Sequence, residues 1–250
     1  MHHFFADPCQ IKNKVVCVEG ADVNHMRNVL RMKPGEQVKI SDGQGNEYLC
    51  EVGRYEEKCA LLSIVSSGKG GTELPSRIFL FQGLPKSDKM ELIIQKAVEL
   101  GVYQIIPAMT KRTVVKLDAK KAGKKIERWN QIVLSAAKQS GRSMIPEVMP
   151  VMTFGEALQY ARKMDIVLIP YEKAEGMEKT GKIISAVRPG QDIGVFIGPE
   201  GGFEEEEVEK AVQSGAHPVT LGKRILRTET AGLAMLSILM YQLESVTVSP

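Results

Sequence analysis

The feature that most restricts the possible folds is the alternation of short apolar runs with longer amphipathic runs after Pro75. Short, fully apolar runs are typical of strands buried on both faces, as in a parallel sheet. The expected strands are residues 77–82, 103–107, 165–170, 192–197 and 218–221. The expected helices are residues 88–101, 124–140, 154–164, 180–187, 204–214 and 230–243. This order predicts an α/β domain with helices on both faces of a parallel sheet.

Before Pro75 the pattern is that of a small β domain. Closely spaced strand-like runs separated by turn residues favour a small barrel. The runs are residues 15–18, 37–41, 47–52 and 59–65. Residues 66–75 are rich in Gly and Ser, which predicts a flexible linker. We therefore expect two domains, residues 1–71 and residues 72–250.

Two helix starts carry predicted capping residues. Asp22 precedes apolar residues at helical spacing and is the expected N-cap of the one helix in the β domain. Asp88 is followed three residues later by Glu91, which predicts a start of the capping-box type. Gly101 is the expected C-cap of that second helix.

Composition narrows the class of protein. Hydrophobic residues make up 43% and charged residues 25% of the chain, as is usual for a soluble globular protein. No apolar run approaches the roughly 20 residues that span a bilayer, and the first residues do not resemble a secretory signal. We therefore expect a cytoplasmic protein with no membrane partner. The four cysteines form no CxxC pair and there are only four histidines, so we predict no metal site.

The charge is unevenly distributed. Residues 111–128 carry eight lysines and arginines against two acidic residues, a local net charge of +6, whereas the whole chain has +3. A concentrated basic segment binds a phosphate backbone through charge neutralisation and counterion release. A solvated loop and helix face would carry the same charge, so charge alone leaves both interpretations open.

Three loops follow expected strands and are candidate ligand sites, because ligands bind beyond the carboxyl ends of the strands in open α/β sheets. They are residues 168–172, 197–203 and 221–231. Glycines in the second loop allow a close backbone approach to a ligand, although a plain strand-to-helix turn would also have them. Four acidic residues at 204–207 follow, which argues against phosphate and favours a neutral or cationic ligand such as an adenosyl sulfonium.

The common motifs of other enzyme classes are absent. The sequence has no GxGxxG after a strand, no GxxxxGK[ST], no GxSxG and no HExxH. Kinase, dehydrogenase and hydrolase functions therefore lose support. Residues 230–243 are apolar on nearly all sides, which predicts a helix buried either in the core or against another subunit.

Two long motifs identify a family. Residues 198–203 read GPEGGF and residues 221–231 read LGKRILRTETA. Both closely resemble the RsmE family, whose members methylate N3 of a uridine in 16S rRNA. The resemblance continues in residues 28–35, 82–86, 96–102 and 136–142 and covers essentially the whole chain.

The resemblance implies a fold, a cofactor and an oligomeric state. The first domain would be a PUA-like β-barrel that helps to hold RNA, and the second a SPOUT α/β domain with a carboxyl-terminal trefoil knot. The knot loops would bind S-adenosyl-L-methionine (SAM), near the subunit interface of a homodimer. The implied cofactor-binding residues are Leu168, Ile169, Pro170, Tyr171, Glu172, Ile197, Gly198, Pro199, Glu200, Gly201, Gly202, Leu221, Gly222, Arg224, Ile225, Leu226, Arg227 and Thr228.

The chemistry of this reaction selects further candidates. N3 of uracil must lose a proton before it attacks a methyl group, and negative charge then develops toward O2 and O4. Arg227 and Arg142 are candidates for stabilising that charge. Glu229 is a candidate for accepting the proton or orienting an arginine, and it could equally be a helix cap. The candidates for contacting 16S rRNA in the small ribosomal subunit are Arg27, Arg31, Lys33, Lys86, Lys111, Arg112, Lys120, Lys121, Lys124 and Lys125.

Three other functions compete with this one. A non-catalytic, ribosome-associated RNA-binding protein of the same fold would be expected to have degraded cofactor loops, which this chain does not have. A SPOUT methyltransferase could act on another RNA, such as transfer RNA. A nucleotide-binding metabolic enzyme would bind ATP or NAD in preference to SAM.

Overall fold

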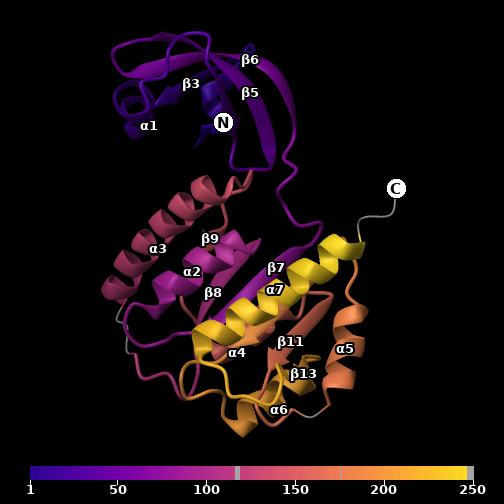
Figure 1. Cartoon of the computed structure of the whole chain (residues 1–250). Helices are drawn as coiled ribbons and strands as arrows, with labels where there is room; N and C mark the ends of the chain where they lie inside the picture. Colours follow the sequence, from indigo (N-terminus) through magenta and orange to yellow (C-terminus); the bar gives the residue numbers. More distant parts are fainter. Residues whose placement is uncertain (116–118, 175, 247–250) are drawn as a thin grey trace. The chain divides into compact units, whose positions relative to one another are not determined.

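The computed structural model describes residues 1–115, 119–174 and 176–246. The chain divides into two compact units (Figure 1). Unit 1 comprises Met1–Glu73 and Ala137–Ile145, and unit 2 comprises Leu74–Ala136 and Pro146–Pro250. No helix in the described part of the chain is long and apolar enough to cross a membrane.

Unit 1 is built on a six-stranded sheet with the strand order β1-β4-β5-β6-β3-β2. β1 is parallel to β4, and the other neighbouring strands are antiparallel. Alternate side chains such as Val16 and Val18, or Val38 and Ile40, form its buried core. The elements are β1 (His3–Phe5), a 3-10 turn (Pro8–Gln10), β2 (Ile11–Lys12), β3 (Val15–Glu19), α1 (Ala21–Asn24), a π-helical turn (His25–Val29), β4 (Gln37–Ser41), β5 (Asn46–Tyr55) and β6 (Cys59–Lys69).

Two sequence predictions for unit 1 are wrong. The expected linker begins at Ser66, but β6 continues to Lys69 because the long β5 supplies hydrogen-bonding partners, including Leu49 opposite Ser66. The expected N-cap is Asp22, but Gly20 takes that position. The carboxylate of Asp22 instead accepts a hydrogen bond from Lys138 Nζ at 2.8 Å. In both places an interaction distant in sequence overrides a local preference.

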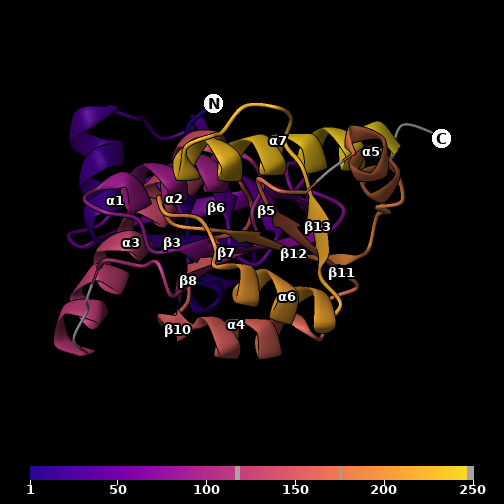
Figure 2. The same ribbon diagram turned by 90° about the horizontal axis from the view of Figure 1, so that it is seen from below.

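Unit 2 contains the predicted parallel sheet. In the described residues it has seven strands, in the order β10-β8-β7-β12-β11-β13 with β9 paired to β8. Helices α4 and α6 cover one face, and α2, α5 and α7 cover the other (Figure 2). The strands are β7 (Arg77–Gly83), β8 (Gln104–Met109), β9 (Glu147–Val148), β10 (Met152–Thr153), β11 (Ile166–Pro170), β12 (Asp192–Ile197) and β13 (His217–Val219). The helices are α2 (Lys89–Glu99), α3 (Ala119–Ser140), α4 (Phe154–Ala161), α5 (Met177–Ser185), α6 (Glu205–Gln213) and α7 (Thr228–Val246).

The centre of this sheet is formed by β7 and β12. Their rings Phe81 and Phe196 stack at 4.3 Å between centroids, and Phe154 of α4 packs on Phe196 at 5.8 Å. Because neighbouring strands are parallel, β7, β12, β11 and β13 end at the same edge of the sheet. The loops that follow these strands are therefore neighbours in space.

Several element ends in unit 2 differ from the prediction. Asp88 does occupy the N-cap position of α2, but its side chain makes no capping hydrogen bond. Glu91 pairs with Arg128 of α3, with 2.8 Å from Nη2 to Oε2, so the predicted capping box is wrong. α3 begins at Ala119 and α7 at Thr228, both earlier than expected. The C-cap of α2 is Leu100, and Gly101 follows it with a φ of +86°.

Candidate functional site

A cavity of about 410 Å³ opens at the carboxyl ends of β11, β12 and β13. Its volume lies in the range of about 300–1,000 Å³ that is typical of small-molecule and cofactor sites. All of the predicted cofactor-binding residues line it except Leu168 and Ile169, which are fully buried inside β11. Four further residues line the cavity: Phe203 and Ala231 belong to the predicted ligand loops but not to the predicted cofactor-binding residues, and Lys89 and Thr220 were not predicted at all.

The loop after β12 approaches β7 so closely that a side chain would not fit between them. A Cβ on Gly83 would lie 2.6 Å from the Cδ and the backbone nitrogen of Pro199. Gly202, in the same loop as Pro199, has a φ of +67°, a conformation that side chains disfavour. The glycines thus shape the wall of the cavity.

Three residues connect this wall to the next loop. Gln82, at the end of β7, is fully buried, and its Nε2 donates a hydrogen bond to Thr228 Oγ1 at 3.0 Å. Thr228 Oγ1 in turn donates to the carbonyl oxygen of Gly198 at 2.6 Å. The start of α7 is therefore joined to the end of β7 and to the loop after β12 by hydrogen bonds that are fully or partly buried.

A cluster of charges lies at the mouth of the cavity. Lys89 Nζ is 3.1 Å from Glu200 Oε1 and 3.5 Å from Glu229 Oε2. Glu200 also accepts a hydrogen bond from the backbone N–H of Lys86 at 3.1 Å. Partial burial opposes ionisation of Glu200, but hydrogen bonds from its own backbone N–H, Lys89 and the Lys86 N–H outweigh it. These bonds hold the pKa of Glu200 below its usual value.

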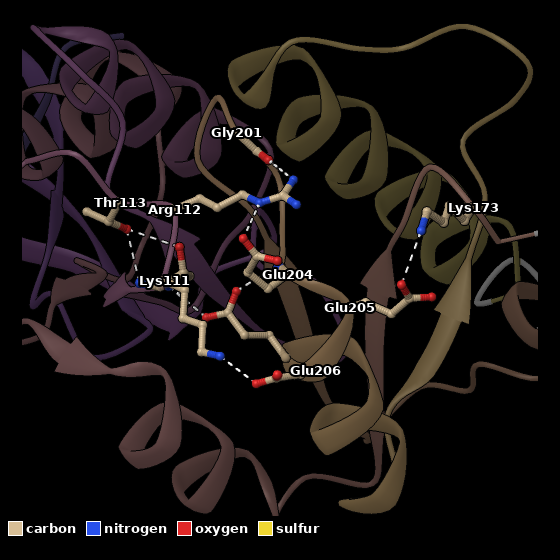
Figure 3. Close-up of polar contacts among 10 residues, drawn as sticks. Lys111, Arg112, Thr113, Lys173, Gly201, Glu204, Glu205 and Glu206 are labelled. Carbon is tan, nitrogen blue, oxygen red and sulfur yellow. Dashed lines mark hydrogen bonds and ion pairs between the residues drawn. The ribbon is translucent and has the colours of Figure 1, made fainter.

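The acidic start of α6 pairs with cations from neighbouring loops (Figure 3). Arg112 Nε donates to Glu204 at 2.9 Å, and Arg112 Nη1 donates to the carbonyl oxygen of Gly201 at 2.7 Å. Lys111 pairs with Glu206. The loop after β8 is therefore attached both to α6 and to the glycine loop.

Glu207 differs from its acidic neighbours in its burial and in its hydrogen bonds. It is buried, with 3% of its surface exposed, and its carboxylate accepts hydrogen bonds from the backbone N–H groups of Lys111 (2.8 Å) and Glu204 (2.9 Å). A carboxylate therefore already occupies the N-terminus of α6, where a phosphate would bind in a phosphate-binding loop. This arrangement agrees with the expectation of a neutral or cationic ligand.

Two of the three catalytic candidates, Arg227 and Glu229, belong to unit 2. Arg227 is exposed and lines the cavity. Glu229 lies in the first turn of α7, and its buried Oε2 has no hydrogen-bond partner among the described residues, although Lys89 is near. Arg142 belongs to unit 1, where its Nε donates to Glu73 at 3.2 Å, whereas the cavity is built from unit 2.

The RNA-contact candidates of unit 1 are Arg27, Arg31 and Lys33, all exposed. The guanidinium of Arg27 lies over the ring of Tyr55, 4.9 Å from its centroid, and donates to the carbonyl oxygen of Glu56 at 2.6 Å. The Arg27 side chain is therefore ordered by its neighbours while it remains at the surface.

The candidates of unit 2 are in different environments. Lys111 and Arg112 are exposed but take part in the ion pairs described above. Lys86, Lys121 and Lys124 are exposed. Lys125 is half-buried, with its Nζ 5.7 Å from the centre of a Trp129 ring. The side chain of Lys120 lies outside the described residues.

Comparison with known proteins places the chain in a family. Residues 72–240 match the model of an RNA methyltransferase domain, and residues 18–59 match that of an RNA methyltransferase PUA domain. A ribosomal RNA small subunit methyltransferase E from Bacillus subtilis is 39% identical over 230 residues, which are 91% of this chain and 90% of the relative. The chain belongs to the ribosomal RNA small subunit methyltransferase E family. The resemblance to the RsmE family that the loop motifs carry is thus confirmed.

Solved structures of this kind match both domains. A ribosomal RNA small subunit methyltransferase E from Neisseria gonorrhoeae, bound to S-adenosyl methionine, has a TM-score of 0.79 at 34% identity over 95% of each chain. A putative methyltransferase from Legionella pneumophila in complex with SAM has a TM-score of 0.80 at 32% identity, over 95% of this chain and 96% of the other. The predicted α/β class with a PUA-like first domain is confirmed, and the knot stays a prediction.

Proposed function

We propose that this chain transfers the methyl group of SAM to N3 of a specific uridine in 16S ribosomal RNA. The observation that carries the proposal is the cavity at the sheet edge, which is lined by residues of both family motifs. Membership of the methyltransferase family supplies the reaction class, and the family resemblance supplies the methylated atom. A substrate in the small ribosomal subunit implies a cytoplasmic enzyme.

The cavity fits SAM better than a nucleoside phosphate. Its wall combines apolar side chains such as Leu221, Ile225 and Leu226 with charged groups of both signs, which are Glu172, Glu200, Lys89, Arg224 and Arg227. Apolar surface suits the adenosine, and groups of both signs suit the methionyl part, which carries an ammonium, a carboxylate and a sulfonium. The occupied N-terminus of α6 disfavours phosphate. The cofactor-binding residues are therefore proposed to be those predicted ones that line the cavity.

When bound, the cofactor supplies a methyl group that its sulfonium has already activated. The protein then has to place uracil N3 in line with the carbon–sulfur bond and stabilise the charge that develops on the base. Of the two candidate arginines, Arg227 is the one proposed to stabilise this charge, because it lines the cavity. Arg142 is committed to Glu73, which supports a structural role in unit 1.

The exposed side of α7 supports a homodimer. Its inner side, including Met235, Leu236 and Leu239, is buried in unit 2. On its outer side Ile238 is 41% exposed and Tyr241 73% exposed. An exposed apolar helix face of this kind is typical of a subunit interface.

The experiment that tests this function measures transfer of labelled methyl from SAM to small ribosomal subunits that lack the modification. Nucleoside analysis then identifies the product. Label in N3-methyluridine is the expected result. Label in another nucleoside, or only in another RNA, would assign the enzyme to a different substrate. Cofactor binding without any transfer to ribosomal or transfer RNA would contradict the proposed reaction.

A further inference from the structure

Lys89 is a charged residue of the cavity that the sequence analysis missed. It lines the cavity from the first position of α2. Its ammonium is held by carboxylates from two other elements, Glu200 in the loop after β12 and Glu229 in α7. The side chain is only 29% exposed, so the ammonium is positioned at the cavity rather than free in solvent.

The position of Lys89 is unfavourable for the helix that carries it. The N-terminus is the positive end of the helix macrodipole, so a cation there is repelled. The N-cap residue Asp88 makes no side-chain hydrogen bond that would compensate. A lysine at a position that the helix dipole disfavours, and that lines a cavity, is expected to have a function in that cavity.

The charges around Lys89 keep it protonated and leave it able to bind a ligand. Its hydrogen bond to Glu200 raises the pKa of Lys89 above the usual value. An ammonium has three N–H donors, so its close contact with Glu200 at 3.1 Å and its longer ion pair with Glu229 at 3.5 Å leave at least one donor for the cavity. The other charged residues that line the cavity are Glu172, Arg224 and Arg227.

We propose that Lys89 donates a hydrogen bond to one of the two uracil carbonyl oxygens that flank N3 and stabilises the negative charge that forms when N3 loses its proton. This inference rests on the proposed N3 methylation. In it, Glu200 and Glu229 are positioning residues that hold the ammonium in place. The role corresponds to the preorganised cation that many enzymes place where charge develops.

The reaction balances with Lys89 unchanged. The N3 proton leaves to water, and the base becomes an anion whose charge is shared by N3 and the two carbonyl oxygens. The electron pair on N3 then forms the bond to the methyl carbon, while the carbon–sulfur bond breaks and leaves its pair on sulfur. Anion and sulfonium are both neutralised, so the cation is needed only until the methyl group has moved.

Lys89→Met tests this role because it keeps the length of the side chain and removes its charge. We expect kcat/KM at neutral pH to fall by about 10²–10³-fold, the usual effect of losing one charge-stabilising donor. The loss should shrink as pH rises, because hydroxide then removes the N3 proton without help. Lys89→Arg should recover part of the activity. RNA with 5-fluorouridine at the target position has a more acidic N3. This RNA should raise the activity of Lys89→Met more than it raises the activity of the wild type.

Two further measurements separate this role from a structural one. Calorimetric SAM affinity should be nearly unchanged in Lys89→Met, and the wild type, but not the variant, should bind the ionised 5-fluorouridine RNA more tightly than the uridine RNA. Lys96→Met is the matched control, since Lys96 lies in the same helix and its ammonium pairs with Glu99 at 2.9 Å, within that helix. It should behave as wild type.

The outcomes distinguish this inference from the proposed function. A wild type that makes no N3-methyluridine overturns both. A normal wild type, with a Lys89→Met loss that is equal at every pH and is not relieved by 5-fluorouridine, overturns the role of Lys89 alone. A parallel loss of SAM affinity and activity in Lys89→Met would also overturn the proposed role of Lys89, because it would identify a purely structural role.

Discussion

Thr228 Oγ1 donates a hydrogen bond of 2.6 Å to the carbonyl oxygen of Gly198 and accepts one of 3.0 Å from Gln82. These two bonds hold the start of α7 against the loop after β12 and the end of β7. Thr228 is 5% exposed, so water cannot readily replace its hydroxyl.

Thr228→Val keeps the shape of the side chain and removes both bonds. We expect the free energy of unfolding to fall by about 1–3 kcal/mol, the cost of leaving buried partners unsatisfied. The Kd for SAM should rise as well, because the loop loses its support. Urea unfolding and calorimetry measure the two effects. Thr230→Val, at an exposed position two residues on, is the control; an equal loss there would contradict the assignment.

Gly83→Ala tests the close approach of β7 to the loop after β12. A Cβ at this position would lie 2.6 Å from Pro199, so the loop must move and the cavity must change shape. We expect weaker SAM binding, measured by calorimetry. The control is Gly181→Ala in α5, where the added Cβ would have no other atom within 4 Å. This change should stabilise the helix by about 0.5–1 kcal/mol. Unchanged SAM affinity in Gly83→Ala would show that the close approach is not needed.

We expect the ion pair between Arg112 and Glu204, beside the glycine loop, to depend on pH. The hydrogen bond from Arg112 holds the pKa of Glu204 below its usual value. The ion pair is therefore fully formed above the usual glutamate pKa and breaks as pH falls through the lowered value. In Arg112→Ala the pKa of Glu204 should return toward the usual value in an NMR titration. Lys173→Ala removes the partner of Glu205 instead and should leave the pKa of Glu204 as it is.

The basic segment predicts a salt-dependent RNA affinity. Replacing Lys120, Lys121, Lys124 and Lys125 by Ala should weaken RNA binding. It should also reduce the slope of log K against log salt by about 0.7–0.9 for each phosphate that the variant no longer neutralises. Filter binding or fluorescence anisotropy over a salt series measures both. Lys179 and Lys182 in α5 provide a control with the same kind of charge. An unchanged slope would remove the segment from the RNA interface.

The exposed face of α7 predicts a dimer. Ile238→Glu with Tyr241→Glu places two charges on that face without touching its buried side, and should produce a monomer in sedimentation velocity. Val212→Glu on α6 changes an apolar residue that is 45% exposed, similar to Ile238, and should leave the assembly unchanged. A monomeric wild type would contradict the proposal.

Much of the fold and part of the site could be predicted because their signals are local. Residues 192–197 form β12 at the predicted bounds, since a short apolar run is recognisable from its own composition. The GPEGGF and LGKRILRTETA motifs lie in loops at strand ends, where ligands usually bind. Lys89 carried no such signal. A lysine after Asp88 looks like an ordinary surface residue until Glu200 and Glu229 are beside it.

The sequence by itself determined the order of strands and helices, the division into a β-rich and an α/β part, and the family. Each of these depends on periodicity or on contiguous motifs, which a linear chain displays. Only the tertiary structure decided which charges meet. The sequence allowed Arg142 to be a cavity residue, but in the structure it is bound to Glu73 in unit 1. The sequence likewise allowed Lys111 and Arg112 to contact RNA, but they pair with Glu206 and Glu204. Ion pairs and hydrogen bonds act over a few ångströms, and the folded backbone alone brings such distant residues within that range.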